Sequence, residues 1–246
     1  MLAKKFVDAG AFVGIADLNA RAMRTTAKEL GVRGYELDVT NPGSIQKCRK
    51  AFLADSGHID ILVNNAGIVF GGAFATIPLD QHRLTFEVNA IGPVSVTHAF
   101  YKDLCARPEA SIVFVASASG YIGLPNGTSY ASSKWAAIGF AESLRLELQE
   151  EGKRHVHVTT VCPSYIDTGM FSGAEAPLFT PMLQTEVVAD AIVKAIQTNR
   201  KFVELPWIVR WIQTLRGLLP RSLFDRVMHV TGVSKSMSHW KGKSSS

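Results

Sequence analysis

Tyr130 and Lys134 lie four residues apart in Tyr-Ala-Ser-Ser-Lys, within the helical pattern Ser129–Gln149. Residues at i and i+4 share one face of a helix, so the ammonium group would lie beside the phenol. A free tyrosine titrates at a pKa of about 10, and a neighbouring cation favours the phenolate and lowers that pKa. The pair could therefore act as a general acid/base. A surface pair on an ordinary helix is the plainer interpretation, and the spacing alone does not decide.

Three further polar features fall where an active site would need them. Asn64-Asn65-Ala66-Gly67 directly follows the apolar run Ile59–Val63, and Ser117 directly follows Ser111–Ala116. If the runs are parallel strands, both features lie at carboxyl ends, where ligands bind in such sheets. A Ser117 hydroxyl could donate a hydrogen bond to a carbonyl oxygen. Asn89 interrupts an apolar stretch and needs a buried partner or a water. A turn, a cap and a satisfied core amide are the respective plainer interpretations.

The elements that would position these residues alternate between strand and helix. Short β-rich runs are predicted as strands at Ala11–Asp17, Arg33–Leu37, Ile59–Val63, Ser111–Ala116, Val156–Val161 and Phe202–Leu205. Helical patterns between them are Ala20–Leu30, Pro42–Asp55, Leu79–Leu104, Ser129–Gln149 and Gln184–Thr198. Such alternation predicts an α/β fold with a doubly wound, mostly parallel sheet and helices on both faces.

Composition excludes several other classes of protein. The chain has 246 residues, 47% hydrophobic and 19% charged, which is typical of a globular protein. Its three cysteines are far apart, which argues against a disulfide scaffold and favours a reducing, cytoplasmic location. No metal site is predicted. Residues 200–246 contain nine Lys/Arg and two Asp/Glu, so the remainder is close to neutral and a nucleic-acid partner is not expected.

Taken together, Asn64–Gly67, Asn89, Ser117, Tyr130 and Lys134 resemble the short-chain dehydrogenase/reductase family over roughly residues 1–205. The resemblance implies a Rossmann-like fold and makes Tyr130 the catalytic acid/base. It implies that Lys134 lowers the tyrosine pKa and holds the nicotinamide ribose, that Ser117 orients the carbonyl or hydroxyl, and that Asn89 holds a water in the proton path.

The resemblance also implies a set of cofactor-binding residues. Besides Tyr130 and Lys134, the matching positions are Asn65, Ala66, Gly67, Asp38, Val39, Pro163, Ile166 and Thr168. Asp17 ends the strand Ala11–Asp17, where a carboxylate binds the ribose hydroxyls and repels a 2′-phosphate. This predicts NAD rather than NADP. An acid at a helix N-terminus is the plainer explanation of Asp17.

One part of the family pattern is absent from this sequence. No first strand and no TGxxxGxG turn precede the helical pattern that contains Phe6 and Val7. The missing strand would be central in the sheet, between Ala11–Asp17 and Ile59–Val63. Two interpretations stay open: a natural start before Met1, or a shortened form that binds cofactor poorly.

The C-terminal part divides into two predicted segments. Residues 206–233 form an amphipathic helical extension, with apolar residues recurring at helical spacing and a break at Pro220. It could be a lid over an apolar substrate, a peripheral membrane contact through 206–231, or a surface packed on the body or a second subunit. Residues 234–246 are polar and expected to be disordered.

These observations predict an oxidoreductase that interconverts an alcohol and a ketone or aldehyde. The substrate would be a small, apolar molecule, and the enzyme a homo-oligomer. The alternative is a catalytically impaired member of the family that serves as an oligomerisation or membrane-contact module.

Overall fold

Six parallel strands form two separate sheets in the computed structural model, which describes residues 1–242. β1 (Gly14–Asp17) pairs with β2 (Arg33–Glu36). The second sheet has the order β3-β4-β5-β6. Its strands are β3 (Ile61–Asn64), β4 (Ala110–Val115), β5 (Val156–Pro163) and β6 (Phe202–Leu205). Within residues 1–242, β1 and β3 are not hydrogen-bonded to each other, so the break lies where the central strand was expected.

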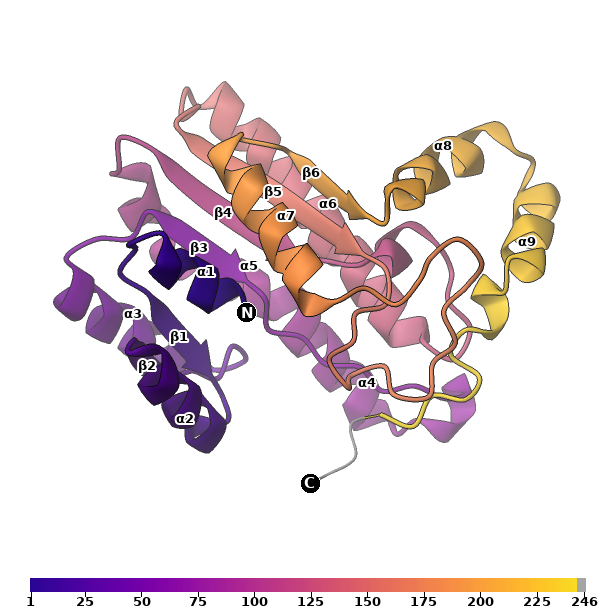
Figure 1. Cartoon of the computed structure of the whole chain (residues 1–246). Coiled ribbons are helices and arrows are strands. Elements are labelled where there is room, and N and C mark those ends of the chain that lie inside the picture. The colour runs from indigo at the N-terminus through magenta and orange to yellow at the C-terminus, as the bar shows by residue number, and fades with distance from the viewer. Residues whose placement is uncertain (243–246) are drawn as a thin grey trace.

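Helices cover both faces of the four-stranded sheet (Figure 1). Alternate residues of β4 separate the two cores, because Ile112 and Phe114 face one side and Val113 the other. The first side is covered by α3 (Pro42–Ser56), α5 (Gly92–Cys105) and α6 (Thr128–Glu150). The second is covered mainly by α7 (Thr185–Gln197), with α1 (Leu2–Asp8) packed against it. The doubly wound α/β arrangement predicted from the sequence is therefore confirmed.

Local sequence signals set several helix ends as expected. Asn19 caps α2 (Ala20–Leu30) by accepting a hydrogen bond from Ala22 N. Asn41 caps α3, since its Oδ1 accepts from Gly43 N and Ser44 N at 2.8 and 3.1 Å. The predicted start of this helix at Pro42 is confirmed.

The single helix expected over Leu79–Leu104 is wrong. The structure has α4 (Leu79–Phe86), a π-helical turn (Glu87–Ile91) and then α5. Pro93, at the start of α5, has no N–H to donate and its ring crowds the carbonyl of Asn89 four residues earlier. The π turn relieves that clash, and it places Asn89 in the interior of the protein.

The C-terminal residues are ordered around the body rather than extended from it. A 3₁₀ turn (Trp207–Arg210) leads into α8 (Trp211–Leu218) and α9 (Arg221–Val230), which lie at the opposite end of the molecule from β1 and β2 (Figure 1). Val209 and Phe224 are buried in one cluster with Ile138. None of the helices within residues 1–242 is long and apolar enough to cross a membrane.

The expectation of a disordered tail over 234–246 is wrong for 234–242. Ser236 and Met237 are each 1% exposed, and Trp240 Nε1 donates a hydrogen bond to the Met170 carbonyl at 3.1 Å. The segment is mostly polar, but its two apolar residues Met237 and Trp240 pack against the body and order it. Residues 243–246 lie outside the described residues.

Candidate active site

Tyr130 lies in the first turn of α6 and its side chain is buried. Its ring packs edge-on against Phe171, with the ring centroids 5.7 Å apart, and Phe171 in turn packs against Tyr165. Burial raises the pKa of Tyr130 to about 12, although a hydrogen bond with the Ser117 side chain acts in the opposite direction. At neutral pH the phenol is therefore protonated.

Lys134, one turn further along α6, is also buried. Its Nζ donates a hydrogen bond to the Val115 carbonyl at 2.9 Å and lies 5.8 Å from the centre of the Tyr130 ring. Burial lowers the pKa of Lys134 to about 8. The ammonium group has three donors, and Val115 is the acceptor that the described residues provide.

The pKa of Tyr130 is not lowered overall in this structure, and Lys134 is not among the groups that shift it. The direction is upward, because removal from water penalises the phenolate more strongly than any nearby group stabilises it. Spacing on the helix placed the two residues correctly on one face. It carried no information on how deeply both would be buried.

Ser117 lies two residues after the last residue of β4, at the carboxyl end of that strand. Its side chain begins the 3₁₀ turn Ala118–Tyr121, accepting hydrogen bonds from Ser119 N at 3.1 Å and Ser119 Oγ at 2.9 Å. The cap that was the plainer interpretation of Ser117 is therefore present. It does not exclude contact with a substrate, because the same hydroxyl also interacts with Tyr130.

Asn89 joins the loop after β3 to α6. Its Oδ1 accepts from Ile68 N at 2.8 Å, and its Nδ2 donates to the Ile68 carbonyl at 2.9 Å and to Ser133 Oγ at 3.0 Å. Ser133 Oγ donates in turn to the Tyr130 carbonyl at 2.7 Å. Sequence reasoning missed Ser133, although its position three residues after Tyr130 is a signal that it could reach back to that carbonyl.

Asn65, Ala66 and Gly67 follow β3 at the same edge of the sheet as Ser117. A Cβ atom at Gly67 would lie 3.4 Å from Lys134 Nζ and 3.5 Å from Asn89 Oδ1. The missing side chain thus leaves the backbone of this loop open beside the buried ammonium. Gly67, Asn89 and Lys134 are brought together from three separate parts of the chain.

The residues expected near the adenine end belong to the other sheet. Asp17 ends β1, is exposed, and accepts a hydrogen bond from Asn19 N at 2.8 Å. Asp38 follows β2 and its Oδ1 accepts from Thr40 N and Thr40 Oγ1. Val39 packs close to Gly92, where a Cβ would lie 2.9 Å from Val39 Cγ2. Nothing hydrogen-bonds this sheet to the four-stranded one within residues 1–242.

The third expected segment follows β5. Pro163 ends that strand, and Ile166 forms an isolated bridge with Leu183. Thr168 is exposed in the loop that follows. This loop continues to Met170 and Phe171, which pack in the cluster that contains Tyr130.

The C-terminal segment 233–242 completes the surroundings of Tyr130. Met237 is buried in the same cluster as Tyr130 and Leu124, with Trp240 packed against them. Tyr165 Oη donates to Ser236 Oγ at 2.7 Å, which ties the segment to the loop after β5. The walls around the tyrosine are therefore apolar and aromatic. No group of three or more His, Cys, Asp or Glu within residues 1–242 could hold a metal ion.

Comparison with known proteins gives a consistent result. The family model of short chain dehydrogenases matches residues 1–177. Human 17-beta-hydroxysteroid dehydrogenase 13 is 32% identical over 222 residues, covering 87% of this chain and 74% of that protein. Mouse epidermal retinol dehydrogenase 2 is 32% identical over 228 residues, covering 89% and 74%.

A solved structure shares the fold. A short chain dehydrogenase/reductase from Burkholderia phymatum, in complex with NAD, superimposes with a TM-score of 0.80 at 23% identity, covering 88% of each chain. The chain is a member of the short chain dehydrogenase family.

Proposed function

We propose that this chain interconverts an alcohol and a ketone or aldehyde with a nicotinamide cofactor. The observation that carries the proposal is the meeting of Tyr130, Ser117 and Lys134 at the carboxyl edge of β3–β5, beside the open backbone of Gly67. Oxidoreductase chemistry on alcohols is common to the family and to its hydroxysteroid and retinol dehydrogenase relatives.

The residues fit a nicotinamide cofactor at this edge. Lys134 is a buried cation whose single hydrogen bond leaves donors for ribose hydroxyls. A side chain at position 67 would fill the space beside it. The residues that would line the same cofactor lie at or just after the carboxyl ends of β3 and β5: Asn65, Ala66, Pro163, Ile166 and Thr168. When bound, the nicotinamide carries the hydride.

The chain's own residues then handle the proton and the geometry. Tyr130, protonated at neutral pH, donates its phenolic proton to the carbonyl oxygen during reduction and accepts it back during oxidation. Ser117 holds that oxygen by a hydrogen bond. Lys134 holds the ribose. Asn89 acts as a positioning residue, since both donors of its Nδ2 and one acceptor site of its Oδ1 join Ile68 to Ser133.

The cofactor we propose is NAD rather than NADP. Asp17 is an exposed carboxylate at the carboxyl end of β1, where it would accept hydrogen bonds from both ribose hydroxyls and repel a 2′-phosphate. Asp38 and Val39 follow the neighbouring strand β2 and would contact the adenine.

The substrate we propose is an apolar alcohol or carbonyl compound. Tyr130 is surrounded by Phe171, Tyr165, Met237 and Trp240, so a ligand beside its hydroxyl would meet aromatic and thioether surfaces. Two relatives are named as a hydroxysteroid dehydrogenase and a retinol dehydrogenase, and apolar alcohols of these kinds support the proposal.

Two exposed apolar surfaces support further contacts of the chain. Exposed Trp207, Trp211 and Leu218 support a peripheral membrane contact through 206–231. Exposed Leu84, Phe86 and Ile91 support a homo-oligomer.

Substitution Tyr130→Phe tests the reaction. It removes the proton donor and keeps Lys134, so we expect turnover to fall by about 10²–10⁴-fold while NADH binding stays within threefold of the wild type. The measurements are steady-state rates on a panel of retinoid and steroid alcohols and NADH titration by fluorescence. Lys134→Ala is the contrasting variant, and it should lose both rate and NADH affinity. Turnover of the phenylalanine variant within tenfold of the wild type would contradict the acid/base role.

The alternative, a catalytically impaired module, is favoured by one observation. Within residues 1–242, β1 and β3 are not hydrogen-bonded to each other, so Asp17 and Asp38 lie on a different sheet from the one that positions Tyr130. Calorimetric NADH titration of the chain distinguishes the two functions. Absence of NADH binding, together with vesicle or self-association, would favour the module, and submicromolar NADH binding would favour the enzyme.

A further inference from the structure

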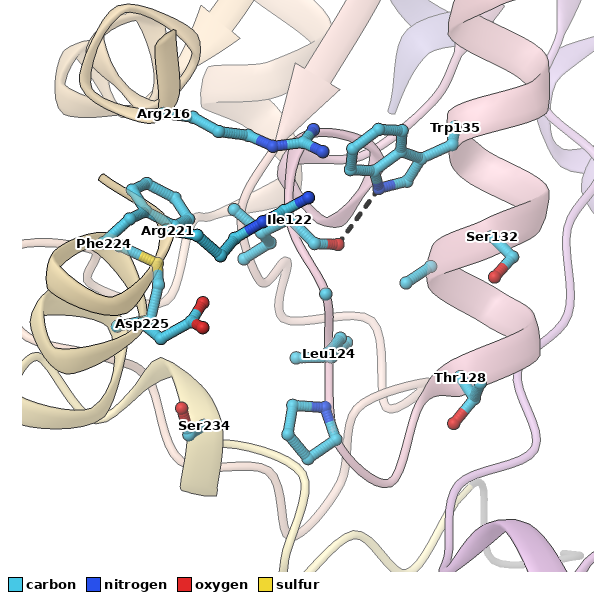
Figure 2. A pocket seen from close by; sticks show the side chains of 14 residues that line it. Ile122, Leu124, Thr128, Ser132, Trp135, Arg216, Arg221, Phe224, Asp225 and Ser234 are labelled. Carbon is cyan, nitrogen blue, oxygen red and sulfur yellow. Dashed lines mark hydrogen bonds between the residues drawn. The ribbon is translucent and has the colours of Figure 1, made fainter. Parts of the chain in front are cut away.

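A groove of about 700 Å³ lies between α6, the segment 122–125 and α9 (Figure 2). Two helices supply most of its walls with residues at spacings of three, four and seven. On α6 these include Thr128 and Trp135, and on α9 they include Arg221 and Met228. Tyr130 does not line it, although Tyr130 and the groove share a neighbour in Leu124. The groove is therefore separate from the proposed catalytic site.

One part of the groove is apolar. Ile122, Leu124, Phe224 and Met228 line it. Ile122 and Phe224 are buried in the cluster that joins α9 to the body, and Leu124 is buried in the cluster that contains Tyr130. A polar or strongly hydrated ligand would gain nothing from this surface. An alkyl chain lying on it would be removed from water, which is worth roughly 25 cal/mol for each Å² buried.

The other part of the groove carries two guanidinium groups. Arg216 stacks over the Trp135 ring, 4.1 Å from its centre, and donates to the Tyr121 carbonyl at 3.2 Å. Arg221 points into the groove from the first residue of α9 (Figure 2). Burial and the charge of Arg221 both lower the pKa of Arg216.

Neither of these two arginine side chains forms an ion pair with a carboxylate of residues 1–242. Among residues 1–242, no Asp or Glu oxygen lies within 4.0 Å of the Arg216 or Arg221 nitrogens. Arg221 also occupies the positive end of the α9 dipole, where a cation is unfavourable and an anion is favourable. The repulsion between Arg216 and Arg221 would be relieved by an anion bound between them.

Asp225 is the carboxylate that opposes this charge. It lines the groove one turn after Arg221 and faces it in Figure 2, without forming an ion pair with either arginine. Because it is exposed, water screens much of its effect. Its presence weakens the site for an anion without abolishing it, and this provides a variant that should strengthen binding.

We propose that this groove binds an amphiphilic anion. The head, a carboxylate or a phosphate, is held by Arg216 and Arg221, and the alkyl chain lies along Ile122, Leu124, Phe224 and Met228. A guanidinium stacked on an indole is pre-ordered for such a head, because its plane is already fixed.

Four probes that share either the head or the chain test this by calorimetry, each below its micellar concentration. Dodecanoate and dodecyl phosphate carry both parts, dodecyl maltoside carries the chain with a neutral head, and inorganic phosphate carries a head alone. We expect the two anionic amphiphiles to bind at one site at least tenfold more tightly than the other two. Their relative affinity identifies the preferred head.

Variants of the full chain locate the site. Arg216→Gln and Arg221→Gln should each weaken dodecyl phosphate binding at least fivefold, and Asp225→Asn should strengthen it. Arg226→Gln is the matched control, because it removes the same charge from α9 at a residue that does not line the groove. Tyr130→Phe should leave the affinity unchanged, which separates this site from the catalytic one.

Three results would overturn the proposal. The first is an equal loss in the Arg226 and Arg221 variants, which would mean general attraction to a basic surface. The second is inorganic phosphate or dodecyl maltoside binding as tightly as dodecyl phosphate. The third is unchanged affinity in Asp225→Asn together with Arg221→Gln, and these two exposed substitutions are not expected to impair folding.

Discussion

The two sheets of this molecule differ in how their strands are covered. In β4 the five residues Ala110–Phe114 are buried, and in β5 only His157 is not. In β1 no residue is buried, and in β2 only Tyr35 is. The four-stranded sheet positions Tyr130, Lys134 and Ser117, whereas Asp17 and Asp38 lie at the ends of the strands of the two-stranded sheet. The groups proposed to transfer the proton are thus held by a buried sheet, whereas the residues proposed to bind the adenine end of the cofactor are held by a largely exposed one.

Hydrogen exchange tests most directly whether the two sheets differ in local stability. We expect amides of β4 and β5 to exchange through global unfolding and those of β1 to exchange at least ~100-fold faster through local opening, because β1 is paired along one edge only. Mass spectrometry with peptides covering 14–17 and 110–115 would report the ratio. Equal protection, corrected for intrinsic rates, would show that the two sheets open as one unit.

Alanine substitutions in the two cores test the same difference in stability. Leu104 lies in α5, is fully buried against the large sheet, and its substitution by alanine should lower the unfolding free energy by about 3–5 kcal/mol. Met23 packs on the small sheet against Gly34, and the same change there should lower the unfolding free energy by closer to ~2 kcal/mol, because Tyr35 is the one buried residue of that sheet's two strands. Urea denaturation of both variants checks this. A larger loss for Met23→Ala would reverse the order of the two regions.

The pH dependence of stability tests whether the Lys134 ammonium, on α6 beside the large sheet, is removed from water. Burial lowers the pKa of Lys134 to about 8 in the folded chain, while the unfolded chain keeps its proton up to about pH 10.5. Between these values the unfolded state binds more protons, so stability from this group rises with pH. The unfolding free energy of the wild type relative to Lys134→Met should therefore increase from pH 7.5 to 9.5. A constant or falling difference would mean that Lys134 is not desolvated.

The smallest expected effect is on cofactor selectivity, which we assign to Asp17 in the two-stranded sheet. Substitution Asp17→Ser should raise the ratio of kcat/KM for NADP to that for NAD by about tenfold, because repulsion of the 2′-phosphate is removed. Glu36→Ser is the matched control, since Glu36 pairs with Asp17 in the register of β1 and β2 and is also exposed. A wild-type preference for NADP, or an equal shift in both variants, would show that Asp17 does not face the ribose.

Sequence alone determined much of the positioning framework. Alternating strand and helix patterns predicted the parallel strands, and Asn41-Pro42 predicted the start of α3, because these signals are local. The spacing of Tyr130 and Lys134 determined that they share a face of α6, and the strand ends determined which edge carries Ser117 and Gly67.

Tertiary structure decided how deeply those residues are buried and which groups surround them. Burial reversed the expected direction of the Tyr130 pKa, because desolvation depends on the loop after β5 and the segment 233–242, which are distant in sequence. Packing also decided that 234–242 is ordered, since Met237 needs a cavity built by other elements. The pairing of Arg216 with Trp135 joins α8 to α6 across 80 residues, and no local pattern in either helix encodes it.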